Sequence, residues 1–406
     1  MADALQEAIT SGPASESLAN ADTKTPTAPT TITEVQPEAR STNQTAIPPT
    51  ADNATVDGTV RTPFISPSST STLPPPRTYT PDQQTKYYTL LNKVQLWTNL
   101  PTTSAPNGPK IPITDSERMW LTRECIYRYL RASKWNEAAA ATRLQATLVW
   151  RREYGVESHT ADYISEENET GKQFILGYDN EGRPCLYLSP HKQNTKKSDK
   201  QIQHLVYMLE RSIDLMPPGQ ETLAILVNFK DTRKGDGATV GQGRQTINIL
   251  QNHYPERLGR SCVQDTPWII WGFFKLINPF IDPLTREKMK FDADLRQVVP
   301  PEQLLKRFGG EVEFEYQHNP YWPAMNGLVE TRKREMRERW EKAGKRVGES
   351  ELYLKGVGGP VAAAEEKKGS AGSAKEGNGV VKGVEFGEGK AEKAIIAQEE
   401  VEGQKV

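Results

Sequence analysis

Cysteine and histidine are scarce in this sequence, and neither sign of charge predominates. Its 406 residues include three cysteines, Cys125, Cys185 and Cys262, which lie far apart and form no CxxC pair. This count and spacing do not suggest a disulfide framework, and a reducing compartment is the default. The five histidines show no paired spacing, so no zinc motif is visible. The formal net charge of −1 gives no global field for nucleic acid, which is not an expected partner.

Phosphate-loop and nucleophile motifs are also missing. The glycine-rich segment 235–243 lies between an expected strand and an expected helix, where a phosphate loop would lie. Val240 stands where GxGxxG requires glycine, and no Walker Gly-Lys-Ser/Thr follows. The segment 259–263 fails the nucleophile-elbow pattern because Val263 replaces its last glycine. We find no catalytic constellation and expect a protein that is not an enzyme and needs no cofactor or metal.

The sequence also lacks the signals of a spanning or secreted protein. The apolar stretch from Pro267 to Ile281 is too short to span a bilayer, which needs roughly 20 apolar residues. The first ten residues have neither a basic n-region nor an apolar h-region, so a secretory signal is not expected. We therefore expect a cytoplasmic protein.

Composition divides the chain into five segments. Residues 1–76 are crowded with Pro, Thr, Ser and Ala, and residues 359–406 with Gly, Lys, Glu and Ala. Neither segment has enough apolar residues to offset the entropy of ordering, so both are predicted to be disordered. The roughly 280 residues between them are enough for one sizeable core with a helical annex. They divide into a helical domain (77–162), an α/β domain (163–320) and a basic helical segment (321–358).

Hydrophobic periodicity supports this division. Asn136 is a good N-cap for a long amphipathic helix in the helical domain. In the next domain, residues 223–229 form a continuous apolar run that predicts a central buried strand. Residues 300–308 are predicted to form a short helix that stops at a pair of glycines. Alternation of strands and helices argues for an α/β fold with a mainly parallel sheet.

Three consecutive pieces stand out between His253 and Lys288. A Tyr-Pro-Glu-Arg-Leu-Gly turn comes first, a run of large apolar residues follows, and Asp-Pro-Leu-Thr-Arg-Glu-Lys closes the stretch. The two ends hold a carboxylate, a hydroxyl and an ammonium. An apolar helix between polar groups suits a protein that encloses an apolar ligand and recognises its polar head.

These pieces resemble the CRAL-TRIO lipid-transfer family, in its fungal phosphatidylinositol-transfer branch. The resemblance extends to Arg-Tyr-Leu-Arg-Ala-Ser-Lys-Trp at 128–135 and to Tyr-Trp-Pro at 321–323, which is similar to the drug-resistance-linked subgroup. It covers about residues 80–358. It implies a CRAL-TRIO lipid-binding domain with a gate helix, preceded by an N-terminal helical domain.

The resemblance also implies a lipid headgroup site formed by Glu256, Lys288, Thr285 and Lys134. Lysine supplies a point charge for phosphate, and glutamate accepts hydrogen bonds from inositol hydroxyls. Thr285 and Lys288 are one helical turn apart, so both can face the same ligand. From the residues alone, Glu256, Lys288 and Lys134 are also compatible with ordinary solvated side chains. Ser133 departs from the basic residue that the best-known relatives carry beside this lysine.

The apolar run is predicted to be a helix with large side chains on nearly all faces. Its alternatives are a core helix or, as the resemblance implies, a gate that covers a lipid pocket. The expected gate residues are Trp268, Ile269, Trp271, Phe273, Phe274 and Ile277. Two acyl chains hold roughly 30 methylenes at about 0.8 kcal/mol each, so their exposure to water would be prohibitive. Lipid exchange must then happen on a membrane.

Residues 331–346 contain eight basic and three acidic residues. Glu335 and Arg339 form a favourable i,i+4 pair, as do Glu338 and Lys342. The segment is either a solvated helix or a helix that contacts anionic lipid.

The leading hypothesis is a phosphatidylinositol transfer protein that binds one lipid in a gated pocket and exchanges it between membranes, supporting lipid homeostasis. One alternative is a lipid-sensing scaffold that presents phosphatidylinositol to a lipid kinase. Another is a carrier of a sterol or another hydrophobic ligand. The expected partners are therefore phosphatidylinositol or a sterol, and a membrane surface. That surface would be the endoplasmic reticulum, lipid droplets or the cell periphery.

Overall fold

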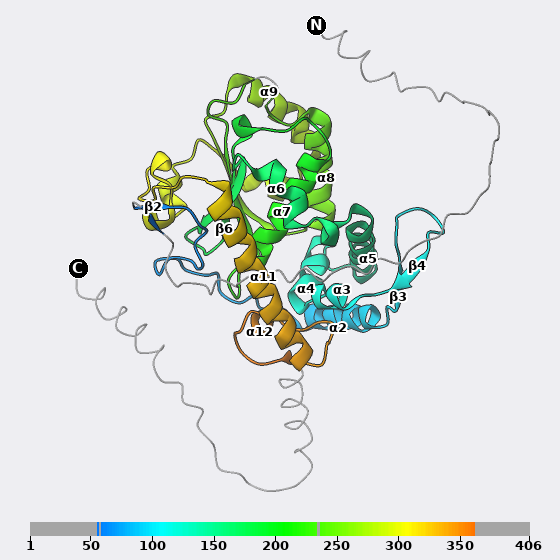
Figure 1. Cartoon of the computed structure of the whole chain (residues 1–406). Helices are drawn as coiled ribbons and strands as arrows, with labels where there is room; N and C mark the ends of the chain where they lie inside the picture. Colours follow the sequence, from blue (N-terminus) through cyan, green and yellow to red (C-terminus); the bar gives the residue numbers. More distant parts are fainter. Residues whose placement is uncertain (1–54, 57, 234–235, 362–406) are drawn as a thin grey trace, which may run out of the picture. The chain divides into compact units, whose positions relative to one another are not determined.

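The computed structural model describes residues 55–56, 58–233 and 236–361 (Figure 1). Most of the two predicted tails therefore lies outside the described residues. Within these ranges, no helix is long and apolar enough to cross a membrane. The same ranges contain no group of three or more His, Cys, Asp or Glu side chains placed to hold a metal ion.

The helical domain forms as its caps and periodicity predict. Its helices are α2 (Pro81–Gln95), α3 (Asp115–Trp120), α4 (Arg123–Ala132) and α5 (Glu137–Tyr154), and its hairpin is β3 (Asn99–Pro101) with β4 (Lys110–Pro112). The side chain of Asn136 caps α5 by accepting from the Ala139 amide, and α5 ends at Gly155, whose φ is 75°. Leu121, Ile126 and Leu144 are fully buried in the core of this domain.

The α/β domain has a five-stranded, mainly parallel sheet, which confirms the predicted fold class. The strands are β5 (Gln173–Tyr178), β6 (Pro184–Leu188), β7 (Leu223–Asn228), β8 (Leu258–Gln264) and β9 (Met289–Phe291), and they are ordered as numbered. Strands β5 and β6 are antiparallel, and the other three pairings are parallel. The Asp179 carboxylate accepts hydrogen bonds from the backbone amides of Glu181 and Arg183 and so closes the turn between β5 and β6.

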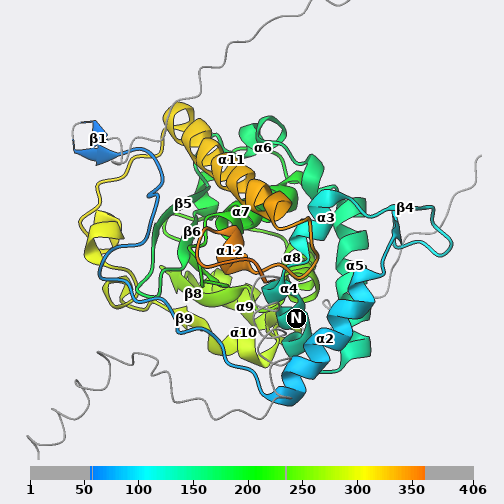
Figure 2. The same cartoon turned by 90° about the horizontal axis from the view of Figure 1, so that it is seen from below.

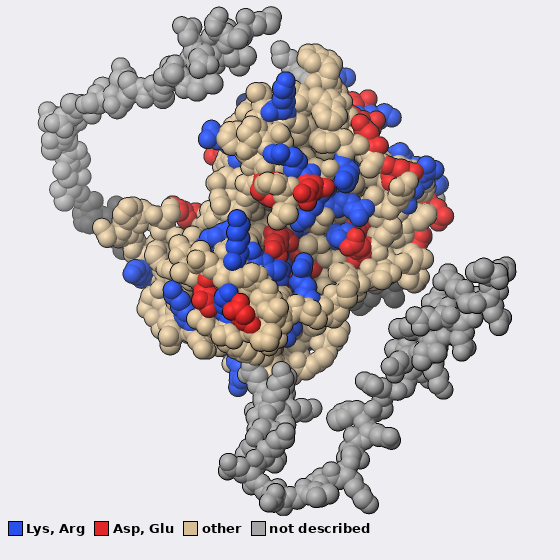
Figure 3. All heavy atoms as spheres, turned by 180° about the vertical axis from the view of Figure 1, so that it is seen from behind, with Lys and Arg blue, Asp and Glu red and all other residues tan. Residues whose placement is uncertain are grey.

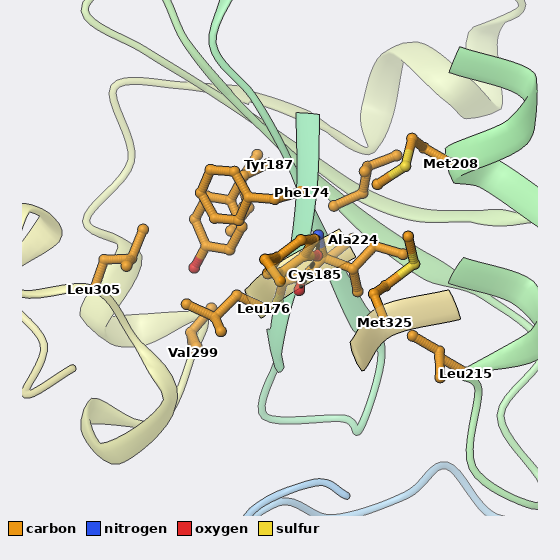
Figure 4. Packing of buried hydrophobic residues seen from close by; sticks show 14 of the residues in the cluster. Phe174, Leu176, Cys185, Tyr187, Met208, Leu215, Ala224, Val299, Leu305 and Met325 are labelled. Atoms are coloured by element: carbon orange, nitrogen blue, oxygen red, sulfur yellow. Dashed lines mark hydrogen bonds between the residues drawn. The ribbon is translucent and has the colours of Figure 1, made fainter. Parts of the chain in front are cut away.

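Helices cover both faces of this sheet. They are α6 (Ala161–Asn168), α7 (Lys200–Asp214), α8 (Val240–His253), α9 (Trp268–Ile277), α10 (Pro283–Glu287), α11 (His318–Lys342) and α12 (Glu351–Leu354). Figure 2 shows α7 and α11 on one side of the sheet and α9 and α10 on the other. Side chains of the sheet, α7 and α11 form one core, in which Phe174 stacks on Tyr187 at 4.9 Å and Met208 and Met325 are fully buried (Figure 4).

The prediction of a short helix over residues 300–308 is wrong. Two 3-10 turns, Pro301–Gln303 and Lys306–Phe308, replace it. The carbonyl of Leu304 accepts from the Val312 amide, and the Lys306 amide donates to the Val312 carbonyl. These bonds hold residues 304–306 in an extended bridge, which is incompatible with a continuous helix.

The predicted disordered arm is also wrong for residues 58–76, which pack on the α/β domain. Val60 is buried, and its amide donates to the Glu313 carbonyl at 2.8 Å. The Thr72 amide donates to the Asn180 carbonyl, and Leu73 fills the space beside Gly182. We call residues 58–79 the strap. Its composition resembles that of a disordered segment, but Val60 is buried and several of its backbone groups bond to the α/β domain.

Candidate functional site

The turn after α8 positions Glu256, the first of the predicted site residues. The Tyr254 hydroxyl donates to the Glu210 carboxylate at 2.6 Å, and Arg257 is buried with its guanidinium on the Glu221 carbonyl at 2.9 Å. Between these two anchors, Glu256 adopts a left-handed φ of 57°. This conformation costs a non-glycine residue of order 1–2 kcal/mol. The strained turn leaves the Glu256 side chain 31% exposed at the start of β8.

Glu256 is bonded to Arg131, a residue that the sequence analysis did not assign to the site. The Arg131 guanidinium, at the end of α4, donates to the Glu256 carboxylate at 2.5 Å. It also donates to the Tyr79 hydroxyl at 2.7 Å and to the Glu221 carboxylate at 3.2 Å. The signal for Arg131 was present, because it belongs to the 128–135 motif that carried the resemblance. The sequence could not show which arginine of that motif faces Glu256.

Lys288 lies at the C-terminal end of α10, in the neighbourhood of Glu256. Its ammonium donates to the Leu258 carbonyl at 2.7 Å, two residues after Glu256. Burial lowers the pKa of Lys288, and the negative charges of Glu256 and Asp282 offset this only in part. A second anion near this ammonium would therefore be stabilised.

Thr285 is positioned by the cap of α10. The Asp282 side chain accepts from the Thr285 amide at 2.9 Å, and its other oxygen accepts from Gln251 of α8 at 3.2 Å. Burial opposes ionisation, but these hydrogen bonds hold the pKa of the Asp282 carboxyl below its usual range. Because α10 is one turn long, Thr285 and Lys288 stay close together, as their spacing predicts. Their role toward a lipid headgroup stays a prediction.

Lys134 lies in the turn between α4 and α5 and is exposed, with a left-handed φ of 51°. Among the described residues, its side chain makes no hydrogen bond or ion pair. The structure therefore brings Glu256, Thr285 and Lys288 into one neighbourhood but gives Lys134 no contact with them. Its predicted headgroup contact remains a prediction.

Buried charges next to the site fix α4 in place. Arg128 donates to Glu221 at 3.0 Å and to Glu351 at 2.8 Å, and Arg77 of the strap lies 3.5 Å from Glu221. The face turned away from α11 shows basic and acidic side chains interleaved across its middle (Figure 3). Arg131, which pairs with both Glu221 and Glu256, connects these charges to the predicted site.

The predicted gate helix, α9, has one packed side and one exposed side. Trp268 is 84% exposed and Trp271 is 46% exposed. On the packed side, Ile277 is buried, and the ring of Phe274 lies edge-on to Phe229 and Phe291 at 6.3 and 5.2 Å. The side chain of Ile269 lies outside the described residues. An exposed indole beside packed rings is unusual for a core helix, which was the alternative interpretation.

Helix α8 contacts α9 and the segment that follows it. A side chain at Gly243 would place its Cβ 2.6 Å from the Phe273 ring, so only glycine allows this approach. Gln251 donates to the Phe280 carbonyl at 3.0 Å as well as to Asp282. A glycine contact, the Gln251 side chain and the Arg244 guanidinium, which lies over the Phe280 ring at 4.6 Å, therefore link α8 to the segment 273–282.

The basic segment 331–346 is not a free surface. Arg332 donates to the Leu215 carbonyl and to the Ile65 carbonyl of the strap, and Arg337 donates to the Ser116 hydroxyl. Arg339 donates to the Leu354 carbonyl at 2.7 Å, and Trp340 is fully buried. Helix α11 thus connects the α/β domain to the helical domain. Neither interpretation from the sequence, a solvated helix or a helix on anionic lipid, foresaw these contacts.

Comparisons with known proteins agree with this architecture. The model of the CRAL/TRIO domain matches residues 168–310, and that of the CRAL/TRIO N-terminal domain matches residues 86–146. A CRAL-TRIO domain-containing protein of Schizosaccharomyces pombe is 50% identical over 301 residues, which cover 74% of this chain and 30% of that protein. The chain therefore matches less than a third of that relative.

Two further relatives carry functional names. The phosphatidylinositol transfer protein PDR17 of Saccharomyces cerevisiae is 42% identical over 257 residues, covering 60% of this chain and 73% of PDR17. The SEC14 cytosolic factor of Kluyveromyces lactis is 28% identical over 212 residues, covering 46% of this chain and 70% of that factor.

Proposed function

Because the chain belongs to the CRAL-TRIO family, we propose that it binds one phosphatidylinositol molecule beneath α9 and transfers it between membranes. The similarity to PDR17 supports this lipid class, since that relative is named as a phosphatidylinositol transfer protein. The observation that carries the proposal is that Lys288, which lies near the charge of Glu256, ends the segment that follows an apolar helix on which Trp268 and Trp271 are exposed.

The charges around Lys288 suit an inositol phosphate. The ammonium would bind the phosphodiester, because its present partner is a neutral carbonyl. The Glu256 carboxylate would accept from inositol hydroxyls. To do so it would share its oxygens with Arg131, which holds the carboxylate in place. Choline offers no hydroxyl donors of this kind, so the pair favours inositol over choline.

The packing of α9 implies where exchange takes place. Opening the helix would expose Phe273, Phe274 and Ile277, at roughly 1.5–3 kcal/mol for each side chain in water. A membrane removes most of this cost, because the exposed rings enter an apolar medium. Trp268 and Trp271 already face outward in the closed form. The helix would therefore open after these indoles contact the bilayer.

Mass spectrometry of the lipid that co-purifies with the full chain tests the ligand class. Phosphatidylinositol in stoichiometric amount is expected, and a sterol in its place would overturn the headgroup assignment. The rate at which labelled phosphatidylinositol moves between two liposome populations tests the transfer step. A protein that holds phosphatidylinositol but does not speed its movement would be a presenting scaffold and not a carrier.

A further inference from the structure

A cavity of about 780 Å³ lies where the helical domain meets α7, α11 and α12, and its lining includes Pro255 and Arg257, the neighbours of Glu256 in the sequence. Figures 1 and 2 both show α11 and α12 beside α3 and α4. Glu256, Thr285 and Lys288 do not line this cavity, and neither does any residue of α9. Its volume falls within the range of small-molecule sites, roughly 300–1,000 Å³.

Positive charge exceeds negative charge on one wall of this cavity. Asp214, at the end of α7, pairs with Arg211 at 3.4 Å. Lys333 of α11 and Lys355, which follows α12, both act electrostatically on the same carboxylate. Neither lysine has a carboxylate within ion-pair distance in the part of the chain that the structure describes. Three cations therefore surround one carboxylate.

The other acids of the cavity do not balance this excess. Glu351 and Glu210 are already paired with Arg128 and Arg151 at 2.8 and 2.7 Å. Glu157, Asp162 and Glu330 are exposed, where water screens them.

Burial makes this excess of positive charge energetically unfavourable. The pKa of Lys355 is lowered to about 8 by burial, which Glu351 offsets only in part. The pKa of Arg257, on the same cavity, is lowered by burial and by the neighbouring charge of Arg128. An anion in the cavity would relieve both effects, because it supplies the missing opposite charge.

Two buried polar atoms on the wall also lack partners. Nε of Arg211 makes no hydrogen bond among the described residues, and neither does Nδ1 of His159, whose side chain is 8% exposed. Buried polar atoms of this kind are normally satisfied by water or by a ligand. The Arg211 guanidinium also lies over the Tyr207 ring at 4.7 Å.

We propose that this cavity binds a phosphate-bearing anion, held by Lys333, Lys355 and Arg211. Lysine ammonium groups and a planar guanidinium are the groups that recognise phosphate. The ligand would join α7 to the two C-terminal helices. Its binding would therefore stabilise the position of α11 and α12 on the helical domain. The proposal is independent of the lipid assigned to the site beneath α9.

Calorimetric titration of the full chain with inorganic pyrophosphate tests the site. Saturable binding is expected for the wild type. Lys333→Met and Lys355→Met should each weaken it about tenfold or more, as the loss of one charge-assisted contact implies. Lys93→Met, at an exposed lysine of α2 far from the cavity lining, is the matched control and should bind as the wild type does. Circular dichroism verifies that each variant is folded.

Asp214→Asn should have the opposite effect on the affinity for pyrophosphate. It removes the carboxylate that competes with the ligand for three cations, so pyrophosphate should bind severalfold more tightly. A cavity whose lysines only solubilise the surface would show no such gain. Unchanged or weaker binding in a folded Asp214→Asn protein would contradict the proposal.

The phosphate could belong to a soluble molecule or to a lipid headgroup, and a second arm separates these sources. Vesicles of phosphatidylcholine with and without phosphatidic acid are sedimented with the wild type and with the Lys333→Met and Lys355→Met variants. Loss of phosphatidic-acid-dependent binding in both variants, without pyrophosphate binding by the wild type, identifies a lipid headgroup. If neither pyrophosphate nor phosphatidic acid distinguishes the variants from the wild type, the proposal is overturned.

Discussion

Helices α9 and α11 use their large and charged side chains in opposite ways. Helix α9 leaves two tryptophans exposed, and its Phe273 ring lies against Gly243 of α8. Helix α11 buries Tyr321 and Trp340 completely and directs its arginines to carbonyls of three other segments. The apolar helix thus keeps an exposed aromatic side, whereas the basic helix is held by buried rings and hydrogen bonds. Apparent hydrophobicity alone would suggest the reverse.

Trp340→Ala tests the packing of α11 and should have the largest effect on stability. The side chain is fully buried, and its indole donates to the Arg346 carbonyl at 2.8 Å. Removing it should lower the free energy of unfolding by about 3–5 kcal/mol. The measurement is urea denaturation, with Trp268→Ala on α9 as the matched control. Equal losses in the two variants would show that the two helices do not differ in this way.

Acid should loosen the same fixed region. Glu210 of α7 is paired with Arg151 of α5. Burial opposes its ionisation, but Arg151 and Tyr254 lower the pKa of this carboxyl to about 2. Because the folded pKa lies below the ordinary value of 4.5, the stabilisation is complete above pH 4.5 and is lost as the pH falls toward 2. Its size is about 3 kcal/mol.

A Glu210→Gln variant checks this pH dependence. It should be less stable than the wild type at neutral pH, and its stability should fall less steeply between pH 4.5 and 2. Thermal melts at several pH values give the slopes. Parallel pH profiles for the two proteins would rule out Glu210 as the source.

The exposed side of α9 should matter for membranes and not for stability. Burying one large apolar side chain in a bilayer contributes about 1.5–3 kcal/mol, whereas one arginine near an anionic surface contributes about 1 kcal/mol. Trp268→Ala should therefore weaken binding to liposomes about tenfold. Arg334→Glu, at an exposed arginine of α11, should weaken it less. Cosedimentation measures both, and the reverse order would make α11 the docking helix.

Gly243 gives the smallest and most local test of how α9 packs on α8. Alanine at 243 would meet the Phe273 ring at 2.6 Å, whereas the nearest atom to a Cβ at Gly241 in the same helix is 3.8 Å away. Helix propensity favours both substitutions by up to about 1 kcal/mol, so only the steric clash differs between them. The tryptophan fluorescence of Gly243→Ala should be less quenched than that of the wild type, and the variant should transfer lipid at a different rate. Gly241→Ala should match the wild type in both measurements. Identical behaviour of the two variants would mean that α9 does not pack there in solution.

Much of the fold could be predicted from the sequence, because local signals and global packing agree. Asn136 caps its helix as expected, and the apolar run 223–229 contains the buried central strand. The core role of α11 was also visible in principle. Tyr321, Met325 and Val329 recur every four residues, although the eight basic residues that follow them favour a surface helix.

The strap and the partner of Glu256 could not be predicted from local pattern. Residues 58–79 have the composition of a disordered segment, and their stability comes from groups distant in sequence, such as Glu313 and Asn180. Arg131 and Glu256 are 125 residues apart, so their contact depends on how the helical domain packs on the sheet. The motif at 128–135 contains both Arg131 and Lys134, but its sequence does not show which of these two side chains faces the site.

Transfer of labelled phosphatidylinositol by a Lys288→Ala protein is the most direct test of the central claim. The variant loses a charge-assisted contact worth about 1.5–3 kcal/mol, so affinity and transfer should fall tenfold or more while the fold stays intact. Lys290→Ala, at the exposed lysine two residues away, is the matched control and should transfer normally. Normal phosphatidylinositol transfer by a folded Lys288→Ala protein would contradict the assignment of the headgroup site.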